Sequence, residues 1–177
     1  YVCKKEEGNK MKMFDIGCGY GAFMKHFEQK GWSTYGVDPD PQAVTIAREN
    51  SSGTVELGNA ENITYAEDLD VVIIMGSLEH VRDPNTVLQN SFKALRKGGI
   101  IVIEGRYMPV SFSYRWLNAN HHRILTDNSC QGLLCKAGFK VVESTTYPVT
   151  GYGTGRQGNG YCIGLKESEA QVKHETQ

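Results

Sequence analysis

The sequence predicts an α/β fold built on a mainly parallel sheet. Segments of strand character alternate with segments whose apolar residues recur at helical spacing, and this alternation is typical of such folds. Residues 70–75 are apolar enough to form a strand that is buried on both faces, as the central strands of parallel sheets are. A glycine-rich turn at 17–21 directly follows the first strand-like segment. These three observations predict a sheet with helices packed against it.

The first half of the chain holds four predicted strands and two predicted helices. The strands cover 12–16, 33–37, 54–57 and 70–75. The first helix covers 22–29, and Gly31 is its stop signal. The second helix covers 41–50, because Pro41 suits a first helical turn and Asp40 suits the N-cap position before it.

A third capped helix and a fifth strand follow. Asp83 and Pro84 are expected to open the helix. Its apolar positions recur at helical spacing and are Val87, Leu88, Phe92 and Leu95. The residues Lys97-Gly98-Gly99 are expected to end the helix, so the fifth strand is expected over 100–104.

In the last third of the chain the regular alternation of strand and helix patterns is interrupted. Residues 106–123 are aromatic and irregular, and a connection of this length is usually functional or disordered. Thr126 is expected to cap a helix that Gly138 ends. A sixth strand is expected to begin with residues 139–142, and a glycine-rich loop leads to a last strand over 161–165.

Composition indicates a globular domain that handles small molecules. The chain has 177 residues, of which 40% are hydrophobic and 22% charged, and its formal net charge is −1. A chain of this size forms one domain with a substantial core. No long basic stripe accompanies the balanced charge, so nucleic acid is not an expected partner. The apolar runs are too short to cross a bilayer and no signal-peptide pattern is seen, so we expect no membrane insertion and a cytoplasmic location.

The cysteines predict neither a disulfide framework nor a zinc site. They are Cys3, Cys18, Cys130, Cys135 and Cys162. Their number is odd and no two of them form a C-x-x-C pair. We therefore expect free thiols in a reducing compartment, and no metal site is predicted.

The glycine-rich turn has a spacing that discriminates between ligands. Gly17, Gly19 and Gly21 form G-x-G-x-G, whereas the dinucleotide fingerprint reads G-x-G-x-x-G and the phosphate loop ends in G-K-[ST]. Glycine combines freedom at positive φ with the absence of a side chain that would block a ligand. Asp15 would be poorly placed beside a pyrophosphate but well placed near an ammonium or a sulfonium group. The turn therefore predicts a site for a small polar ligand with a cationic group.

Five segments, in order along the chain, resemble the motifs of class I S-adenosylmethionine-dependent methyltransferases. They are 15–21 (DIGCGYG), 35–39 (YGVDP), 58–63 (GNAENI), 70–81 (DVVIIMGSLEHV) and 95–103 (LRKGGIIVI). The resemblance covers about residues 11 to 166, and five elements at the family's intervals are far more specific than one glycine loop. It implies a Rossmann-like, doubly wound sheet of seven strands, mainly parallel, with the last strand antiparallel.

The resemblance also implies S-adenosyl-L-methionine as the cofactor and S-adenosyl-L-homocysteine as its product. The family's roles fall on positions at the carboxyl ends of the strands, where open α/β sheets bind ligands. Asp38 would accept both ribose hydroxyls, because a carboxylate offers the two acceptor oxygens that a vicinal diol needs. The expected cofactor-binding residues are Asp15, Gly17, Cys18, Gly19, Gly21, Asp38, Pro39, Ala60, Glu61, Met75 and Gly76.

Three histidines are candidates for proton transfer. His80 follows the fourth strand, at the floor of the acceptor pocket in similar enzymes, although the same segment also recurs in relatives as a structural turn. His121 and His122 precede the helix that Thr126 caps, and the segment resembles the histidine-plus-helix region of small-molecule methyltransferases. Neighbouring histidines are also common on protein surfaces. The aromatic residues that would either line the site or form the core of a lid are Tyr107, Phe112, Tyr114 and Trp116.

The functional hypothesis is a methyltransferase of the EC 2.1.1 type. It would transfer a methyl group by direct displacement to a small-molecule acceptor, such as a sugar, a glycan-linked metabolite or a quinone-like metabolite. Residues 1–166 would form the domain and 167–177 a polar tail. The helices that precede the first strand in the family are not evident, so the chain is expected to be part of a longer protein. Two alternatives stay open, a non-catalytic cofactor-binding or assembly domain and a nicotinamide-dependent oxidoreductase.

Overall fold

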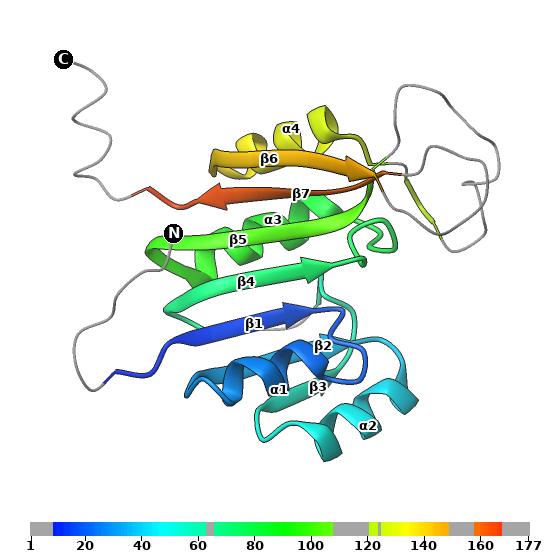
Figure 1. Cartoon of the computed structure of the whole chain (residues 1–177), viewed down its shortest axis with the longest axis vertical. Coiled ribbons are helices and arrows are strands. Elements are labelled where there is room, and N and C mark those ends of the chain that lie inside the picture. Colours follow the sequence, from blue (N-terminus) through cyan, green and yellow to red (C-terminus); the bar gives the residue numbers. More distant parts are fainter. Residues whose placement is uncertain (1–8, 63–65, 108–120, 124, 149–157, 168–177) are drawn as a thin grey trace.

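The computed structural model describes residues 9–62, 66–107, 121–123, 125–148 and 158–167, and within them it forms one sheet flanked by helices (Figure 1). The strands are β1 (Lys12–Ile16), β2 (Ser33–Asp38), β3 (Thr54–Leu57), β4 (Leu69–Met75), β5 (Leu95–Tyr107), β6 (Lys140–Pro148) and β7 (Gly158–Leu165). The helices are α1 (Ala22–Glu28), α2 (Pro41–Asn50), α3 (Pro84–Ala94) and α4 (Asp127–Ala137).

The strand order confirms the predicted fold class. The strands lie in the order β3-β2-β1-β4-β5-β7-β6. The pairs among β1 to β5 are parallel, whereas β7 pairs antiparallel with both β5 and β6. The last strand is therefore the antiparallel one, as predicted.

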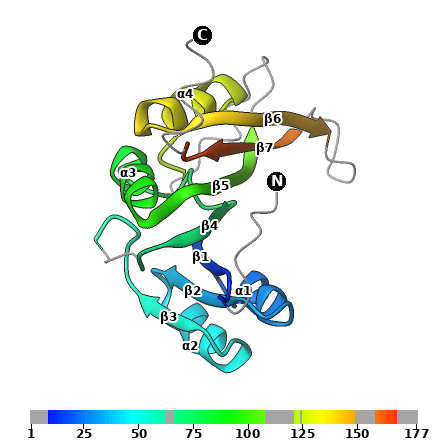
Figure 2. The same cartoon turned by 90° about the vertical axis from the view of Figure 1, so that its left-hand side faces the viewer.

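Helices cover both faces of the sheet (Figure 2). On one face Met24 of α1 and Ala47 of α2 join a buried cluster with Met13 of β1. On the other face Leu88 of α3 and Leu134 of α4 join a cluster with several strand residues. Because successive strand residues point to opposite faces, neighbouring positions of β1 and β4 serve both clusters and the sheet is doubly wound.

The predicted helix caps are confirmed. The Gln42 amide donates to Asp40 Oδ1 at 2.8 Å, and the Asn85 amide donates to Asp83 Oδ1 at 3.0 Å. The Thr126 hydroxyl oxygen accepts a hydrogen bond from the Ser129 amide, and the two residues form a capping box at the start of α4. These short polar side chains satisfy amides that have no partner inside the helix.

The predicted end of α3 and start of β5 are wrong. Leu95 was expected in the helix and Lys97-Gly98-Gly99 were expected to end it, but Leu95 is extended (φ −68°, ψ 138°) and already pairs with Leu69. The Gly98 amide donates to the Lys166 carbonyl at 2.7 Å, and the register of the sheet shifts locally. Pairing with strands distant in the sequence thus outweighs the local glycine signal.

Other predictions fall outside the described residues. Phe112, Tyr114 and Trp116 lie there, and Tyr107 ends β5 without a described side chain. The domain boundary at 166 stays a prediction, although Glu167 Oε1 lies 3.0 Å from Lys140 Nζ of β6. None of the helices in the described ranges is long and apolar enough to cross a membrane.

Candidate functional site

A cavity of about 600 Å³ opens at the carboxyl ends of the parallel strands, the edge to which the arrowheads of β1 and β4 point in Figure 1. Its walls come from the loops after β1, β2, β3 and β4. The residues that line it are Ile16, Gly17, Val37, Asp38, Pro39, Gly58, Asn59, Ala60, Glu61, Asn62, Met75, Gly76, Ser77, His80, Val81, Arg82, Asp83 and His122. This is the place at which open α/β sheets bind ligands.

The cavity gathers most of the residues that the sequence singles out. The predicted residues that line it are Gly17, Asp38, Pro39, Ala60, Glu61, Met75, Gly76, His80 and His122. Those that do not line it are Asp15, Cys18, Gly19, Gly21 and His121. The role predicted for each side chain stays a prediction.

The backbone of the glycine loop is turned toward β2. Gly17 and Cys18 donate their amides to the Val37 carbonyl at 2.9 and 3.0 Å. Gly19 donates its amide to Asp38 Oδ2 at 2.9 Å. Three successive amides are therefore occupied within the protein, whereas a loop that cradles phosphate directs its amides at the anion. The loop suits a ligand without a phosphate at this point.

Two glycines leave backbone bare and one permits close packing. Gly17 has φ 77°, and a Cβ there would lie 2.5 Å from Ser77 Cβ, so the loops after β1 and β4 can meet only because this residue is glycine. A Cβ at Gly19 (φ 51°) or Gly76 (φ 63°) would have none of the described heavy atoms within 4 Å. Backbone at these two positions is open to a ligand.

Asp38 is held in place from two sides. Its Oδ2 accepts from the Gly19 amide and its Oδ1 accepts from the Asp40 amide, each at 2.9 Å. Each carboxylate oxygen has two lone pairs, so both keep acceptor capacity toward the cavity that the residue lines. A fixed carboxylate of this kind suits a vicinal diol.

Asp15 is a buried acid with an unsatisfied oxygen. Its relative exposure is 1%, and Oδ2 has no hydrogen-bond partner among the described residues. Burial, and secondly the charge of Asp38, raise the pKa of Asp15 to about 7. Burial, and after it the charges of Asp15 and Asp38, raise the pKa of the Cys18 thiol to about 12, so this thiol stays protonated. A cationic group would satisfy the two acids, and the residues therefore fit the ammonium, sulfonium and diol of the expected cofactor.

Glu61 has a structural partner that the sequence did not predict. Its Oε1 accepts from the amides of Arg82 and Asp83 at 2.9 and 3.2 Å. The carboxylate thus ties the loop after β3 to the turn before α3. Ala60 beside it is buried and lines the cavity, so the two residues build a wall.

The three candidate histidines come together at one side of the cavity. The ring centroids of His80 and His121 lie 4.8 Å apart with an interplanar angle of 52°. His80 and His122 line the cavity, whereas His121 does not. The backbone amide of His122 donates to the Glu79 carbonyl at 2.9 Å, which joins the segment after β5 to the loop after β4.

Arg123 fixes the same loop. Its Nη1 donates to the carbonyls of Leu78, at 2.7 Å, and Val81, and its Nη2 donates to the carbonyl of Arg82 at 2.8 Å. A planar guanidinium can bind several carbonyls at once because its donors form a rigid fork. The loop that carries His80 is therefore held by a residue from a distant segment.

Sequence reasoning missed Glu79. This residue is 7% exposed and its Oε2 has no hydrogen-bond partner among the described residues. A buried, unpartnered carboxylate is uncommon in folded proteins. The sequence signal that could have identified Glu79 is an acid between Leu78 and His80, in the short loop that follows the largely apolar strand β4.

Comparison with known proteins gives a consistent result. A family profile described as a methyltransferase domain matches residues 14–103. A ubiquinone biosynthesis O-methyltransferase of Cereibacter sphaeroides is 31% identical over 152 residues, which are 75% of this chain and 62% of the relative. The chain therefore spans less than two thirds of the length of this relative.

Solved structures share the fold. A phosphoethanolamine N-methyltransferase 2 of Haemonchus contortus, in complex with S-adenosyl-L-methionine, has a TM-score of 0.76 at 14% identity, over 90% of this chain and 49% of that chain. A SAM-dependent methyltransferase of Methanosarcina mazei has a TM-score of 0.69 at 15% identity, over 90% of this chain and 94% of that chain. At these identities the likeness shows the fold alone.

Proposed function

The chain belongs to the class I S-adenosyl-L-methionine-dependent methyltransferases, and we propose that it transfers a methyl group to a hydroxyl oxygen of a small, quinone-like molecule. A sugar or a glycan-linked metabolite is the other kind of hydroxyl acceptor that we consider. The cytoplasm stays the predicted location.

The proposal rests on one observation: Asp15 is buried with an unsatisfied oxygen, and Asp38 is fixed in the wall of the cavity. Asp15 Oδ2 lacks a described partner, and Asp38 is oriented by the amides of Gly19 and Asp40. Two acids, beside a loop whose Gly17, Cys18 and Gly19 amides are already bonded within the protein, favour a cationic ligand that carries a diol. S-Adenosyl-L-methionine has both groups.

The residues of this chain would bind and align rather than react. Asp38 would accept the ribose hydroxyls, Asp15 would compensate the amino group, and Gly76 would let the backbone approach the methionine end. The bound cofactor supplies a methyl group that is already activated on a sulfonium, so the protein has mainly to orient the two reactants and exclude water. His80 or His122, which line the cavity, would take the proton of the acceptor hydroxyl.

The choice of an oxygen acceptor rests on two supports. The similar proteins from Cereibacter sphaeroides are named ubiquinone biosynthesis O-methyltransferases. In addition, imidazole groups gather at the cavity wall, and a hydroxyl acceptor is one that must lose a proton.

The two alternatives are less well supported. A nicotinamide dinucleotide needs amides for its pyrophosphate, but the amides of Gly17, Cys18 and Gly19 are already bonded within the protein. A non-catalytic cofactor-binding domain would use Asp15 and Asp38 in the same way, but it would have no proton-transfer role for the histidines that line the cavity.

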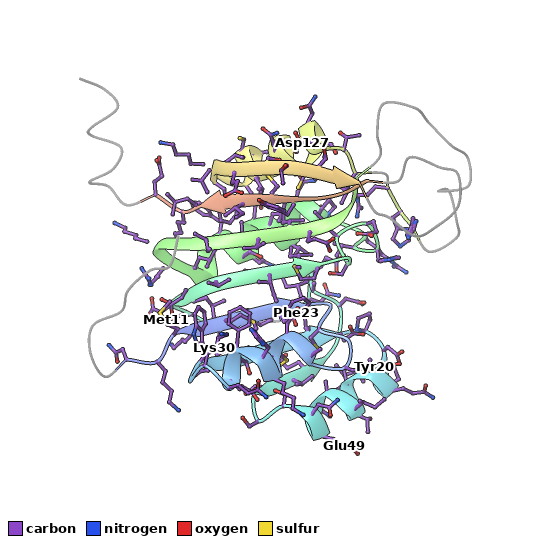
Figure 3. All side chains as sticks on the ribbon, in the orientation of Figure 1. Met11, Tyr20, Phe23, Lys30, Glu49 and Asp127 are labelled. Carbon is purple, nitrogen blue, oxygen red and sulfur yellow. The ribbon has the colours of Figure 1, made fainter. Side chains whose placement is uncertain are left out.

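The test is a turnover assay with S-adenosyl-L-methionine and a panel of catechols, phenols, quinols and sugars, read by mass spectrometry. We expect S-adenosyl-L-homocysteine and a methylated product with at least one aromatic hydroxyl acceptor. Asp38→Ala should abolish both, whereas Glu49→Gln should not. Glu49 is a matched control because this carboxylate extends away from the sheet at the end of α2 (Figure 3). Binding of S-adenosyl-L-homocysteine without turnover of any acceptor would favour the non-catalytic alternative.

A further inference from the structure

We propose that Arg123 is a positioning residue that couples the two sides of the cavity, so that a cofactor bound at one side orders the wall that faces the acceptor. The coupling rests on the proposed function, which assigns the cofactor to the loops after β1, β2 and β3 and the acceptor to the side with the histidines. Arg123 lies in the segment after β5, and its guanidinium binds the loop between β4 and α3, residues 76–83. We call these residues the β4 loop.

Arg82 in the β4 loop is bonded from both sides of the cavity. Its amide donates to Glu61 Oε1, in the loop after β3, at 2.9 Å. Its carbonyl accepts from Arg123 Nη2 at 2.8 Å. One backbone unit thus carries a bond to the expected cofactor wall and a bond to the expected acceptor wall. A shift of Arg82 strains both bonds, so the positions of the two walls are linked.

The segment 121–123 and the β4 loop are joined at further points. Arg123 Nη1 donates to the carbonyls of Leu78, at 2.7 Å, and Val81. The His122 amide donates to the Glu79 carbonyl at 2.9 Å. Four carbonyls of the loop therefore accept from two consecutive residues, and the histidines of both segments are held in one arrangement.

Electrostatic attraction draws Arg123 toward acids of two loops. Burial lowers the pKa of Arg123, and the charges of Asp83, Glu61 and Glu79 oppose this effect. The guanidinium stays protonated, because its ordinary pKa is far above neutrality. Glu61 belongs to the loop after β3, whereas the two other acids belong to the β4 loop. The cation therefore favours the arrangement in which all three segments meet.

The second half of the β4 loop depends on these bonds for its order. The first half has other anchors: Ser77 Oγ donates to the Ile16 carbonyl at 2.7 Å, and Leu78 is fully buried. His80 and Arg82 are exposed instead. Exposed segments with few buried contacts open at a low free-energy cost. When a first ligand orders such a segment, a second ligand that needs the same order binds more tightly, so we expect positive coupling between cofactor and acceptor.

Lysine is the informative replacement for Arg123. A guanidinium is a planar fork with five donors, whereas an ammonium is a point charge on a flexible stem. Arg123→Lys keeps the charge that the neighbouring carboxylates attract, but it cannot reach the three carbonyls in one geometry. The variant thus removes the fixed geometry and retains the cation.

The test is hydrogen exchange of the His122 amide, followed by NMR spectroscopy with and without saturating S-adenosyl-L-homocysteine. This amide bonds to the β4 loop, so its exchange reports how often the acceptor-side segment opens. In the parent we expect the ligand to slow the exchange by at least about 5-fold, the lower end of typical coupling between two sites. The slowing should disappear in Arg123→Lys. Calorimetry should show weaker binding of the ligand to this variant, because coupling is reciprocal.

Arg48→Lys is the matched control. The Arg48 guanidinium, on α2, also donates to a backbone carbonyl, that of Val55, from Nε and Nη2 at 3.1 and 2.8 Å, but it does not line the cavity. The ligand should slow the His122 amide in this variant as it does in the parent. A purely structural role of Arg123 would speed the exchange without ligand and lower the melting temperature, yet it would leave the ligand-induced slowing intact.

Two results would overturn the coupling while the proposed function stands: binding of S-adenosyl-L-homocysteine without slower exchange in the parent, or equal slowing in the parent and in Arg123→Lys. If Arg123→Lys fails to fold, Glu61→Ala decides the matter, because it breaks the same chain of bonds at Arg82 and should also abolish the slowing. Absence of S-adenosyl-L-homocysteine binding by the parent would refute the proposed function instead, and the coupling with it.

Discussion

Replacement of Asp15 by Asn should change how the stability of the protein depends on pH. Asp15 is buried, and its pKa is raised from an ordinary 3.8 to about 7. The folded protein therefore holds this proton more tightly than the unfolded chain does. Stability from this group is complete below about pH 3.8 and is lost as the pH rises to about 7. Asn cannot ionise, so the variant should lack this loss.

The size of the effect follows from the difference between the two pKa values. A difference of one pKa unit corresponds to about 1.4 kcal/mol, so the complete loss amounts to about 4 kcal/mol. Part of that loss has already occurred at pH 5, because the unfolded carboxyl is ionised there. Between pH 5 and pH 8, the free energy of unfolding should therefore fall by about 3 kcal/mol more in the parent than in Asp15→Asn.

The assay is urea denaturation of the ligand-free parent and variant at several values between pH 5 and pH 8. Glu49→Gln serves as the control, since removal of an exposed carboxylate should leave the pH dependence of the parent intact. Parallel curves for the parent and Asp15→Asn would refute the reasoning, because they would mean that Asp15 ionises in the folded protein as it does in water.

Three further predictions concern the cavity and its loops. The affinity of the parent for S-adenosyl-L-homocysteine should rise between pH 6 and pH 8, because the ammonium group of the ligand needs the ionised Asp15 carboxylate. The affinity of Asp15→Asn should not depend on pH in this way. Calorimetry at several pH values measures both, and a flat profile in the parent would contradict the prediction. Gly17→Ala should destabilise the fold by about 1–3 kcal/mol, because the new Cβ would lie 2.5 Å from Ser77 Cβ and because φ is 77° at this position. A thermal melt equal to that of the parent would rule this out. Arg123→Lys should lower stability by about 1–3 kcal/mol through loss of the bonds to the loop after β4, and unchanged hydrogen exchange in that loop would argue against the clamp.

The parts of the fold that the sequence predicted well have local causes. β1 and β3 have the predicted bounds, and the caps at Asp40 and Asp83 act as expected. Strand alternation, a proline in the first turn and a short polar side chain before it all act within a few residues. The order of the strands was accessible only through the resemblance to a family.

The parts that the sequence did not predict depend on contacts between distant residues. Leu95 leaves the helix because it pairs with Leu69, which lies in another strand. Glu61 binds amides on the loop before α3, and Glu79 is buried although it lies in a loop. No local sequence pattern predicts that the ring of His121 lies beside that of His80. Residue types at the cavity could therefore be named in advance, but not their partners.

The most direct test of the central claim is calorimetric titration of the protein with S-adenosyl-L-homocysteine, with NAD as the control ligand. We expect saturable binding of S-adenosyl-L-homocysteine, loss of that binding in Asp38→Ala, and no binding of NAD. Binding of NAD in preference to S-adenosyl-L-homocysteine, or binding that Asp38→Ala leaves unchanged, would contradict the account.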